Sequence, residues 1–249
     1  MRRKRRKRRH QPSDGPVAMT GPHLHERVLR IMEGYARGKV LDAPCGQGAL
    51  ASRLMDMGFQ VYCGDRDPDW FRLTSGHFHI LDLNDPFPYR NGAFDWVTCV
   101  EGIEHLENPH HLLRETARVL KPGGRVLITT PNIMNIKSRL YFLLRSYTNN
   151  FRYIQQPTNQ RELLALHVNP IPFVELKYLL NRNGFSIEQI SCNRYTRKYA
   201  WLMPFLIPVI RSFTRRKNRD ARFLLKRQLL EGDILIVSAV KVDTHPIAQ

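Results

Sequence analysis

Short apolar runs alternate with amphipathic stretches along most of the chain. The apolar runs predict strands at residues 39–43, 60–64, 78–81, 94–100, 125–130, 185–192 and 233–242. Apolar residues at helical spacing predict helices at residues 20–37, 49–57, 109–120 and 173–183. Strands and helices that alternate in this way are typical of an α/β protein with a mostly parallel, doubly wound sheet.

Turn signals and length indicate one domain with additions. A chain of 249 residues, 42% of them apolar, suits a single α/β domain, expected at residues 20–249. Two regions exceed the simple alternation: an insertion at residues 133–170 and a basic, apolar insertion at residues 193–230. Residues 1–19 are expected to be a basic disordered tail, because no apolar segment of the kind found in signal peptides follows the opening charges.

One turn carries the first candidate chemistry. The first predicted strand ends at Asp42, a tight turn with Gly46 and Gly48 follows, and a helical pattern begins at Ala49. Glycines in such a turn let the backbone approach a ligand closely. The acid stands before the glycines, in the order D-x-x-x-G-x-G rather than G-x-G-x-x-G. A carboxylate at that place disfavours a pyrophosphate and favours an ammonium or sulfonium ligand.

Acids follow the predicted strands at the edge where ligands bind in such sheets. Asp42, Asp65, Asp82 and Glu101 stand at the ends of four predicted strands. The carboxyl ends of parallel strands meet at one edge of the sheet, which is where α/β proteins bind ligands. Asp65, at the tip of the second strand, is placed to bind ribose hydroxyls.

These residues resemble the class I S-adenosylmethionine-dependent methyltransferases over roughly residues 39–132, with weaker support as far as residue 192. The resemblance implies a Rossmann-like seven-stranded sheet, S-adenosylmethionine as cofactor and an insertion at residues 133–170 that serves as a lid. It also implies the cofactor contacts, which are Asp42, Ala43, Cys45, Gly46, Gly48, Asp65, Arg66, Asp82, Leu83 and Glu101. Of these, Asp42 and the two glycines would hold the methionine end, Asp65 the ribose, and Asp82 with Leu83 the adenine. Pro44 departs from the family, which often has glycine there.

A second motif, Glu101-x-x-Glu104-His105, bears on the methyl acceptor. It resembles a segment of the ubiquinone-biosynthesis O-methyltransferases and of the 2′-O-methyltransferases of small RNAs. That resemblance implies a divalent metal held by Glu101, Glu104, His105 and His167. Two carboxylates and two imidazoles suit Mn²⁺ or Zn²⁺ better than Mg²⁺. The alternative is a site without metal, in which Glu101 and Glu104 are cofactor and helix-end contacts and His105 is a lone general base. The expected catalytic residues, which act at the acceptor, are His105 and Glu101.

The sequence narrows the acceptor only to a class. Amine methylation of DNA needs an Asn/Asp-Pro-Pro-aromatic motif after the fourth strand, and cytosine C5 methylation needs a Pro-Cys pair; the chain has neither there. Residues 129–132 and 166–170 are similar to segments of methyltransferases encoded among bacterial polysaccharide and lipid-linked glycan genes. The predicted reaction is O-methylation of a glycan, lipid-linked or quinone-like small molecule. The alternatives are RNA 2′-O-methylation and a non-catalytic, cofactor-binding scaffold.

Charge and cysteines bear on location and partners. The net charge is +17, of which residues 1–10 carry +8 and residues 194–227 carry +10. Such segments face an anionic partner, either a membrane surface or nucleic acid. Four separated cysteines (Cys45, Cys63, Cys99 and Cys192) predict reduced thiols in a cytoplasmic protein. No pattern in the sequence sets an oligomeric state.

The insertion at residues 193–230 combines an apolar stretch with a basic one. Residues 200–210 form a run of eleven apolar residues with two prolines, too short for a bilayer span of about 20 residues. Arginines and lysines mixed with phenylalanine and leucine follow it. This composition predicts either an interfacial element on an anionic membrane or a docked helical hairpin with a solvated basic face. The lid aromatics Tyr141, Phe142, Tyr147, Phe151 and Tyr153 likewise either pack on the core or contact substrate.

Overall fold

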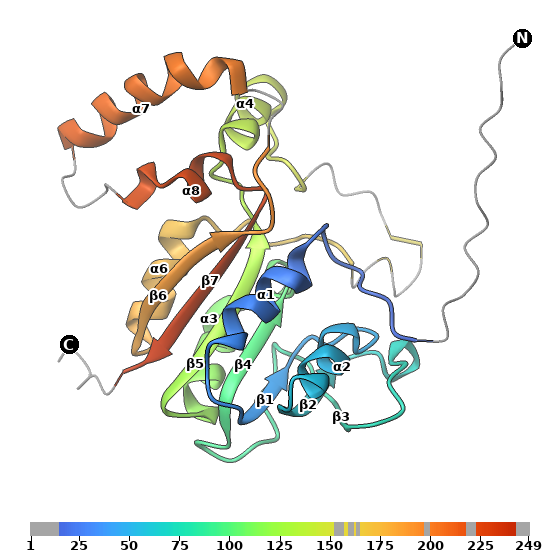
Figure 1. The fold of residues 1–249 in the computed structure, drawn as a ribbon. Helices are drawn as coiled ribbons and strands as arrows, with labels where there is room; N and C mark the ends of the chain where they lie inside the picture. Colours follow the sequence, from blue (N-terminus) through green and yellow to red (C-terminus); the bar gives the residue numbers. More distant parts are fainter. Residues whose placement is uncertain are drawn as a thin grey trace, which may run out of the picture.

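A seven-stranded sheet forms the centre of the protein in the computed structural model (Figure 1), which describes residues 15–151, 157–158, 162, 165–196, 200–217 and 223–242. The strands are β1 (Lys39–Asp42), β2 (Gln60–Asp65), β3 (His77–Ile80), β4 (Phe94–Val100), β5 (Leu120–Pro131), β6 (Phe185–Cys192) and β7 (Ile234–Lys241). Their order is β3-β2-β1-β4-β5-β7-β6, and β7 is antiparallel to both of its neighbours. The predicted fold class is therefore confirmed.

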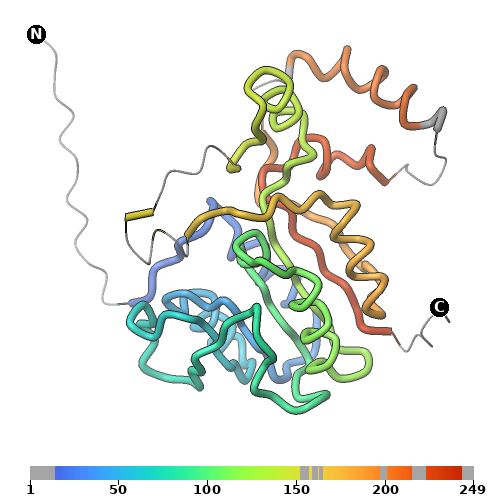
Figure 2. The backbone as a smooth tube through the Cα atoms, turned by 180° about the vertical axis from the view of Figure 1, so that it is seen from behind, coloured from blue at the N-terminus to red at the C-terminus, as the bar shows by residue number. Residues whose placement is uncertain are grey.

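Helices cover both faces of this sheet. On one face α1 (Leu24–Glu33) and α2 (Ala49–Asp56) enclose a core cluster, and on the other α3 (Pro109–Val119) and α6 (Phe173–Arg182) enclose a second. Figures 1 and 2 show these two layers from opposite sides. Each helix buries the apolar stripe that predicted it; in α1 the stripe includes Leu24, Val28 and Met32.

Local turn chemistry corrects the predicted boundaries. The helix expected at residues 20–37 is shorter, because Gly21 and Pro22 precede it and Gly34 follows its last turn. The expected strand at residues 125–130 begins earlier, at Leu120, and pairs with β4 on either side of a register shift. The Lys-Pro-Gly-Gly segment ends α3 as expected. All four cysteines are free and buried, as predicted.

Three further helices lie beyond the carboxyl end of β5 (Figure 1): α4 (Ile136–Arg145), α7 (Met203–Lys217) and α8 (Arg227–Glu231). Two buried asparagines just after β5 hold α4 and α8 in place. The Asn132 side chain donates to the carbonyls of Gln228, Leu229 and Gly232, and Asn135 donates to the same Gly232 carbonyl. Asn135 also caps α4 by accepting from the Ser138 amide. No helix in the described part of the chain could cross a membrane.

Parts of the predicted insertions cannot be compared with the structure. Residues 1–14 of the expected tail lie outside the described residues, as do residues 152–156, 159–161 and 163–164 of the expected lid. The same holds for residues 197–199 and 218–222 of the basic insertion.

Candidate active site

Four acids stand side by side at one edge of the sheet. β3, β2, β1 and β4 are neighbours, and Asp82, Asp65, Asp42 and Glu101 stand at or directly beyond their carboxyl ends. The strand order reverses between β1 and β4, which is the place where open α/β sheets bind their ligands. The sheet therefore gathers residues that lie up to 59 positions apart in the chain.

The glycine turn leaves room beside its backbone. Gly46 and Gly48 have φ angles of 52° and 88°, which favour glycine. A side chain at Gly46 would meet no atom within 4 Å, so this part of the turn borders open space. The Cys45 amide donates to the Gly64 carbonyl over 3.0 Å, which holds the turn on β2. Pro44, the departure from the family pattern, lies with its ring directly against Gly102.

Asp42 is a buried carboxyl group with a free oxygen. It is 1% exposed; its Oδ1 accepts from the Thr98 hydroxyl over 2.7 Å, and its Oδ2 has no hydrogen-bonding partner among the described residues. Burial, together with the nearby charge of Asp65, raises the pKa of Asp42 to about 7. A cation beside Oδ2 would favour the ionised form, which fits the ammonium group of a methionine moiety. The adjacent Ala43 amide donates to the Thr98 carbonyl over 2.9 Å.

Asp65 organises the turn that follows β2. Its Oδ2 accepts from the Gly46 amide over 2.8 Å, and its Oδ1 accepts from the Asp67 amide over 3.2 Å. A carboxylate oxygen can accept more than one hydrogen bond, so both can still receive ribose hydroxyls.

The predicted adenine contacts already have partners in the protein. Asp82 Oδ2 lies 3.1 Å from Arg66 Nε, and its Oδ1 accepts from the Asn84 amide over 2.9 Å. Leu83 is 5% exposed and belongs to a core cluster, so its side chain is committed to packing. Only the backbone of Leu83 is available to a base ring.

Glu101 contacts the segment that leads into α1. Its backbone has a φ of 50°, and its Oε2 accepts from the Gly21 amide over 3.2 Å. Burial raises the pKa of this carboxyl group. A few residues earlier, the Val17 amide donates to Gln47 Oε1 over 2.9 Å. Residues 15–22 are therefore fastened across the glycine turn; sequence reasoning missed Gln47 and Gly21, since no local pattern marks them.

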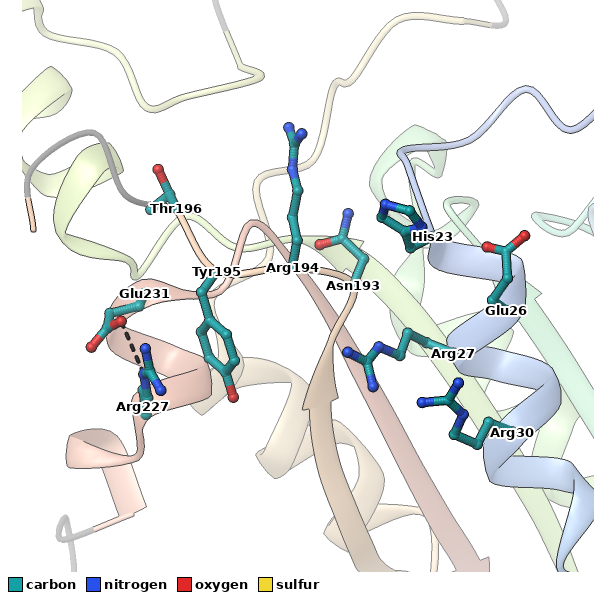
Figure 3. Close-up of a pocket in the computed structure, with 10 residues that line it drawn as sticks. All are labelled: His23, Glu26, Arg27, Arg30, Asn193, Arg194, Tyr195, Thr196, Arg227 and Glu231. Carbon is teal, nitrogen blue, oxygen red and sulfur yellow. Dashed lines mark hydrogen bonds and ion pairs between the residues drawn. The ribbon is translucent and has the colours of Figure 1, made fainter.

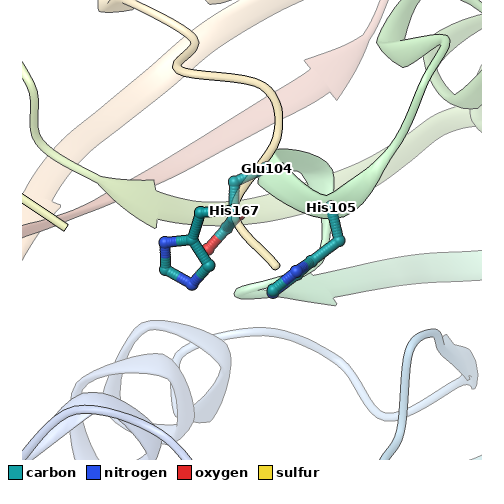
Figure 4. A group of neighbouring side chains, drawn as sticks. All are labelled: Glu104, His105 and His167. Carbon is teal, nitrogen blue, oxygen red and sulfur yellow. The ribbon is translucent and has the colours of Figure 1, made fainter. Parts of the chain in front are cut away.

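Glu104, His105 and His167 form the second part of the site (Figure 4). One candidate ligand atom of each lies within 4.8 Å of the others. The Val168 and Asn169 amides donate to the Glu104 carbonyl, which brings His167 to the motif across more than sixty residues of chain. Glu101, the fourth predicted metal ligand, is not part of this group among the described residues.

The surroundings of Glu104, His105 and His167 suit either a general base or a set of metal ligands. The Leu166 carbonyl lies 2.8 Å from His105 Nδ1, so that nitrogen carries the proton and Nε2 remains an acceptor. Burial lowers the pKa of His105, and burial with the nearby His105 lowers the pKa of His167 to about 4. Glu104 is fully buried, neither carboxylate oxygen has a hydrogen-bonding partner among the described residues, and burial raises its pKa well above the usual range.

The described aromatic residues of the insertion at residues 133–170 lie in three different environments. The Phe151 ring centroid lies 5.3 Å from that of His167, so Phe151 borders the site. Tyr141 is buried and Tyr147 packs edge-on against it at 6.5 Å between ring centroids. Phe142 is 62% exposed. Tyr153 lies outside the described residues.

A separate basic cavity of about 660 Å³ lies between α1, the end of β6 and α8 (Figure 3). Its walls include Arg27, Arg30, Arg194 and Arg227. Arg194 is paired with Asp233, and Arg227 with Glu231. Within the described part of the chain, Arg27 and Arg30 form no ion pair.

The sheet order and the strand-end acids define a class I S-adenosylmethionine-dependent methyltransferase. The chain belongs to the methyltransferase domain family, which matches residues 18–190. S-adenosylmethionine is accordingly the methyl donor. The open space beside Gly46 fits a cationic ligand of this kind, as does Asp42 Oδ2, which has no hydrogen-bonding partner among the residues described.

Curated relatives are similar in sequence to part of the chain. The ubiquinone biosynthesis O-methyltransferase of Xanthomonas oryzae pv. oryzae is 33% identical over 106 residues, which cover 39% of this chain and 44% of the relative. That of Aliivibrio fischeri is 31% identical over 140 residues, which cover 52% of this chain and 58% of the relative. The chain therefore spans about half the length of the curated relatives it matches.

Solved structures share the fold over most of the chain. A SAM-dependent methyltransferase from Archaeoglobus fulgidus aligns with a TM-score of 0.57 and 19% identity, covering 87% of this chain and 90% of that one. An S-adenosylmethionine-dependent methyltransferase from Mesorhizobium loti aligns with a TM-score of 0.54 and 16% identity, covering 86% and 96%. At these identities the likeness concerns the fold alone.

Proposed function

We propose that the protein transfers the methyl group of S-adenosylmethionine to a hydroxyl oxygen of a glycan, lipid-linked or quinone-like acceptor. The observation that supports this most is the His105 ring beside His167 and Glu104 next to the strand-end acids. An imidazole with Nδ1 bonded to the Leu166 carbonyl presents Nε2 as a base. The partial similarity to ubiquinone biosynthesis O-methyltransferases agrees with an oxygen acceptor.

In this proposal the strand-end acids and the turn bind the cofactor. Asp42 would face the ammonium group, and the turn from Cys45 to Gly48 would pass along the methionine moiety. Asp65 would accept from the ribose hydroxyls. The Leu83 backbone and Asp82 would border the adenine, with Arg66 holding the Asp82 carboxylate in place.

His105 would act on the acceptor. Bound S-adenosylmethionine would supply the methyl group, whose carbon would bond to the acceptor oxygen as its bond to sulfur breaks and the sulfur keeps the electron pair. The hydroxyl proton passes to Nε2 of His105, which is neutral at pH 7 because burial lowers its pKa. Phe151, next to His167, would exclude water from this step. Glu101 would fasten residues 15–22 over the bound cofactor.

The same residues fit a divalent metal. Glu104, His105 and His167 offer one carboxylate and two imidazoles. Among the described residues, the Glu104 oxygens and His167 Nδ1 have no hydrogen-bonding partner, which leaves them available as metal ligands. This set would hold Mn²⁺ or Zn²⁺. A bound ion would lower the pKa of the acceptor hydroxyl.

Calorimetry with S-adenosylmethionine, followed by mass spectrometry of lipid and glycan extracts from a deletion strain, tests the proposal. We expect binding that Asp65→Ala weakens, and a lipid or glycan that is 14 mass units lighter in the deletion strain. Absence of cofactor binding, with no effect of Asp65→Ala, would overturn it.

RNA 2′-O-methylation is the second candidate, because Arg27 and Arg30 line the basic cavity without an ion pair among the described residues. In this candidate function, the two arginines would contact the phosphate backbone of the RNA. In that case Arg27→Ala combined with Arg30→Ala would weaken RNA binding and flatten its salt dependence. RNA binding that this double variant leaves unchanged would exclude the cavity as a phosphate track.

A further inference from the structure

Exposed apolar side chains stand out on two neighbouring segments, α4 and the segment from η3 (Ala200–Leu202) through α7; we call the two together the α4–α7 surface. On α4, Phe142, Leu143 and Leu144 are 62%, 77% and 76% exposed. In the second segment, Trp201, Phe205 and Phe213 are each 70% exposed. Few monomeric proteins leave so many large apolar side chains together in water, and such patches mark interaction sites.

The orientation of α7 is the reverse of that expected for a solvated helix. Phe205, Val209 and Phe213 of α7 recur every four positions, so they lie on one face, and that face points to solvent; Trp201, in the turn η3 directly before α7, is exposed as well. Met203, on the other side, is only 9% exposed. A surface helix normally turns its polar side outward. The exposed apolar face of α7 therefore needs a partner.

The charge of the same two segments identifies the kind of partner. Residues 136–145 and 200–217 contain no aspartate or glutamate and carry seven basic residues. Of these, Arg145 on α4 and Arg211 on α7 are exposed. Aromatic side chains surrounded by arginine and lysine, without any acid, are typical of elements that lie in the interface of anionic membranes.

The position of the surface agrees with this partner. Figures 1 and 2 show α4 and the start of α7 near each other at the end of the molecule where β5 finishes, with the rest of α7 projecting away from α4. The buried asparagines 132 and 135 hold α4 and α8 against this end. It is the same end of the sheet that carries the strand-end acids and His105. A helix of 15 residues is about 22 Å long, shorter than a bilayer core of about 30 Å, so α7 would lie along a membrane.

We propose that the α4–α7 surface docks the protein on an anionic phospholipid bilayer, with α7 and the end of α4 immersed at the level of the lipid headgroups. The docking itself does not depend on the proposed function. The further idea that docking delivers a lipid-borne acceptor to the catalytic edge rests on the proposed function. A second copy of the chain is a poor occupant, because a symmetric contact would bring the basic residues of both copies together.

Vesicle flotation tests the docking. The full chain is mixed with vesicles of phosphatidylglycerol and phosphatidylcholine, or of phosphatidylcholine alone, and the floated fraction is measured. We expect the anionic vesicles to bind the protein at least about tenfold more strongly than the neutral ones, since each basic residue near the surface contributes. Trp201→Ser with Phe205→Ser should reduce binding at least about tenfold, as should Leu143→Ser with Leu144→Ser.

Matched controls separate docking from general effects. Ile80→Ser removes an apolar side chain that is 69% exposed on the edge strand β3, and we expect it to leave flotation unchanged. Arg211→Glu should reduce binding to anionic vesicles about fivefold or more, whereas Arg114→Glu, the same change on an exposed site of α3, should not. Calorimetry with S-adenosylmethionine on each variant reports whether the fold and the cofactor site are intact.

Several outcomes would overturn the proposal. One is a wild-type chain that does not float with anionic vesicles although it binds S-adenosylmethionine. Another is flotation that the α4 and α7 variants leave unchanged. A dimer in the absence of lipid that Phe205→Ser dissociates would assign the surface to a second copy. Loss of RNA binding in the same variants, without lipid binding in the wild type, would assign it to nucleic acid. A wild-type chain that does not bind S-adenosylmethionine in calorimetry would refute the proposed function, and flotation alone would then decide whether the protein docks on membranes.

Discussion

At the scale of single residues, the site depends on ionisable groups held away from water. Within the part of the chain that the structure describes, one oxygen of buried Asp42 and both oxygens of buried Glu104 have no hydrogen-bonding partner, and His105 has one nitrogen bonded to a carbonyl. Buried groups of this kind are costly to keep unless a ligand or a reaction uses them. Their clustering at four adjacent strand ends is therefore the strongest local sign of function in the molecule.

Asp42 should make stability depend on pH. The pKa of Asp42 is about 7 in the folded chain and near 3.8 in the unfolded chain. The stabilisation that protonated Asp42 contributes is therefore complete below pH 4 and is lost as the pH rises toward 7. Relative to Asp42→Asn, the wild type should lose up to about 4 kcal/mol of unfolding free energy across that window. Urea unfolding at pH 4, 5.5 and 7.5 measures this. Parallel pH profiles for the two proteins would contradict the buried state of Asp42.

Asp42 should also couple cofactor binding to pH. If the ionised carboxylate faces the ammonium group, affinity for S-adenosylmethionine should fall about tenfold for each unit below pH 7 and level off above pH 8. Calorimetry between pH 5.5 and 8.5 measures it. Asp42→Asn should bind weakly with a flatter profile; an unchanged slope in this variant would remove Asp42 from the cofactor site.

His105 should act on chemistry rather than on cofactor binding. His105→Gln should lower the methyl-transfer rate by about 10² to 10⁴, with the affinity for S-adenosylmethionine within a factor of two or so. His167→Gln distinguishes the two versions of the site. If His167→Gln lowers the methyl-transfer rate as much as His105→Gln does, and added Mn²⁺ or Zn²⁺ partly restores that rate, the site holds a metal. If His167→Gln lowers the rate only slightly, His105 acts as a lone base.

At the scale of elements, the helices that apolar spacing predicts also make polar contacts, in addition to packing an apolar face on the core. α1 buries His25 beside its apolar residues, and its lead-in segment binds Glu101 and Gln47. Apolar periodicity locates the helix but does not reveal these contacts, because the partners come from other strands. The extent of α4 and α8 was likewise not predicted, since both are held by asparagine contacts nearly a hundred residues apart in the chain.

His25 gives α1 a pH-dependent contribution of opposite sign to Asp42. Burial, with the nearby Arg53, lowers its pKa to about 4, so the stability it contributes is present above pH 6.5 and is lost as pH falls toward 4. Compared with His25→Leu, the wild type should lose up to about 3 kcal/mol over that window. Thermal unfolding at pH 4.5 and 7.5 tests this; equal pH sensitivity would mean that His25 is hydrated in the folded state.

At the scale of the whole molecule, hydrogen bonds join segments that are distant in the chain. Residues 15–22, the glycine turn and the start of the loop after β2 meet through the bonds of Val17 to Gln47, Gly21 to Glu101 and Gly46 to Asp65. Saturating S-adenosylmethionine should therefore slow amide hydrogen exchange in all three segments together. Residues 173–182 of α6, on the other face, serve as the control. If S-adenosylmethionine slowed exchange in the glycine turn but not in residues 15–22, the segment that leads into α1 would not close over the site.

The sequence by itself determined the strands, most of the helices, the sheet class and the acids at the strand ends. It could do so because apolar periodicity, glycine turns and strand-end positions are local properties of the chain. Only the tertiary structure decided that Glu101 bonds to Gly21 rather than joining Glu104, His105 and His167, and that Asp82 is already paired with Arg66. It also decided that α7, which starts near α4, turns its apolar face outward. These features depend on which surfaces meet after folding, and spacing along one segment does not encode that.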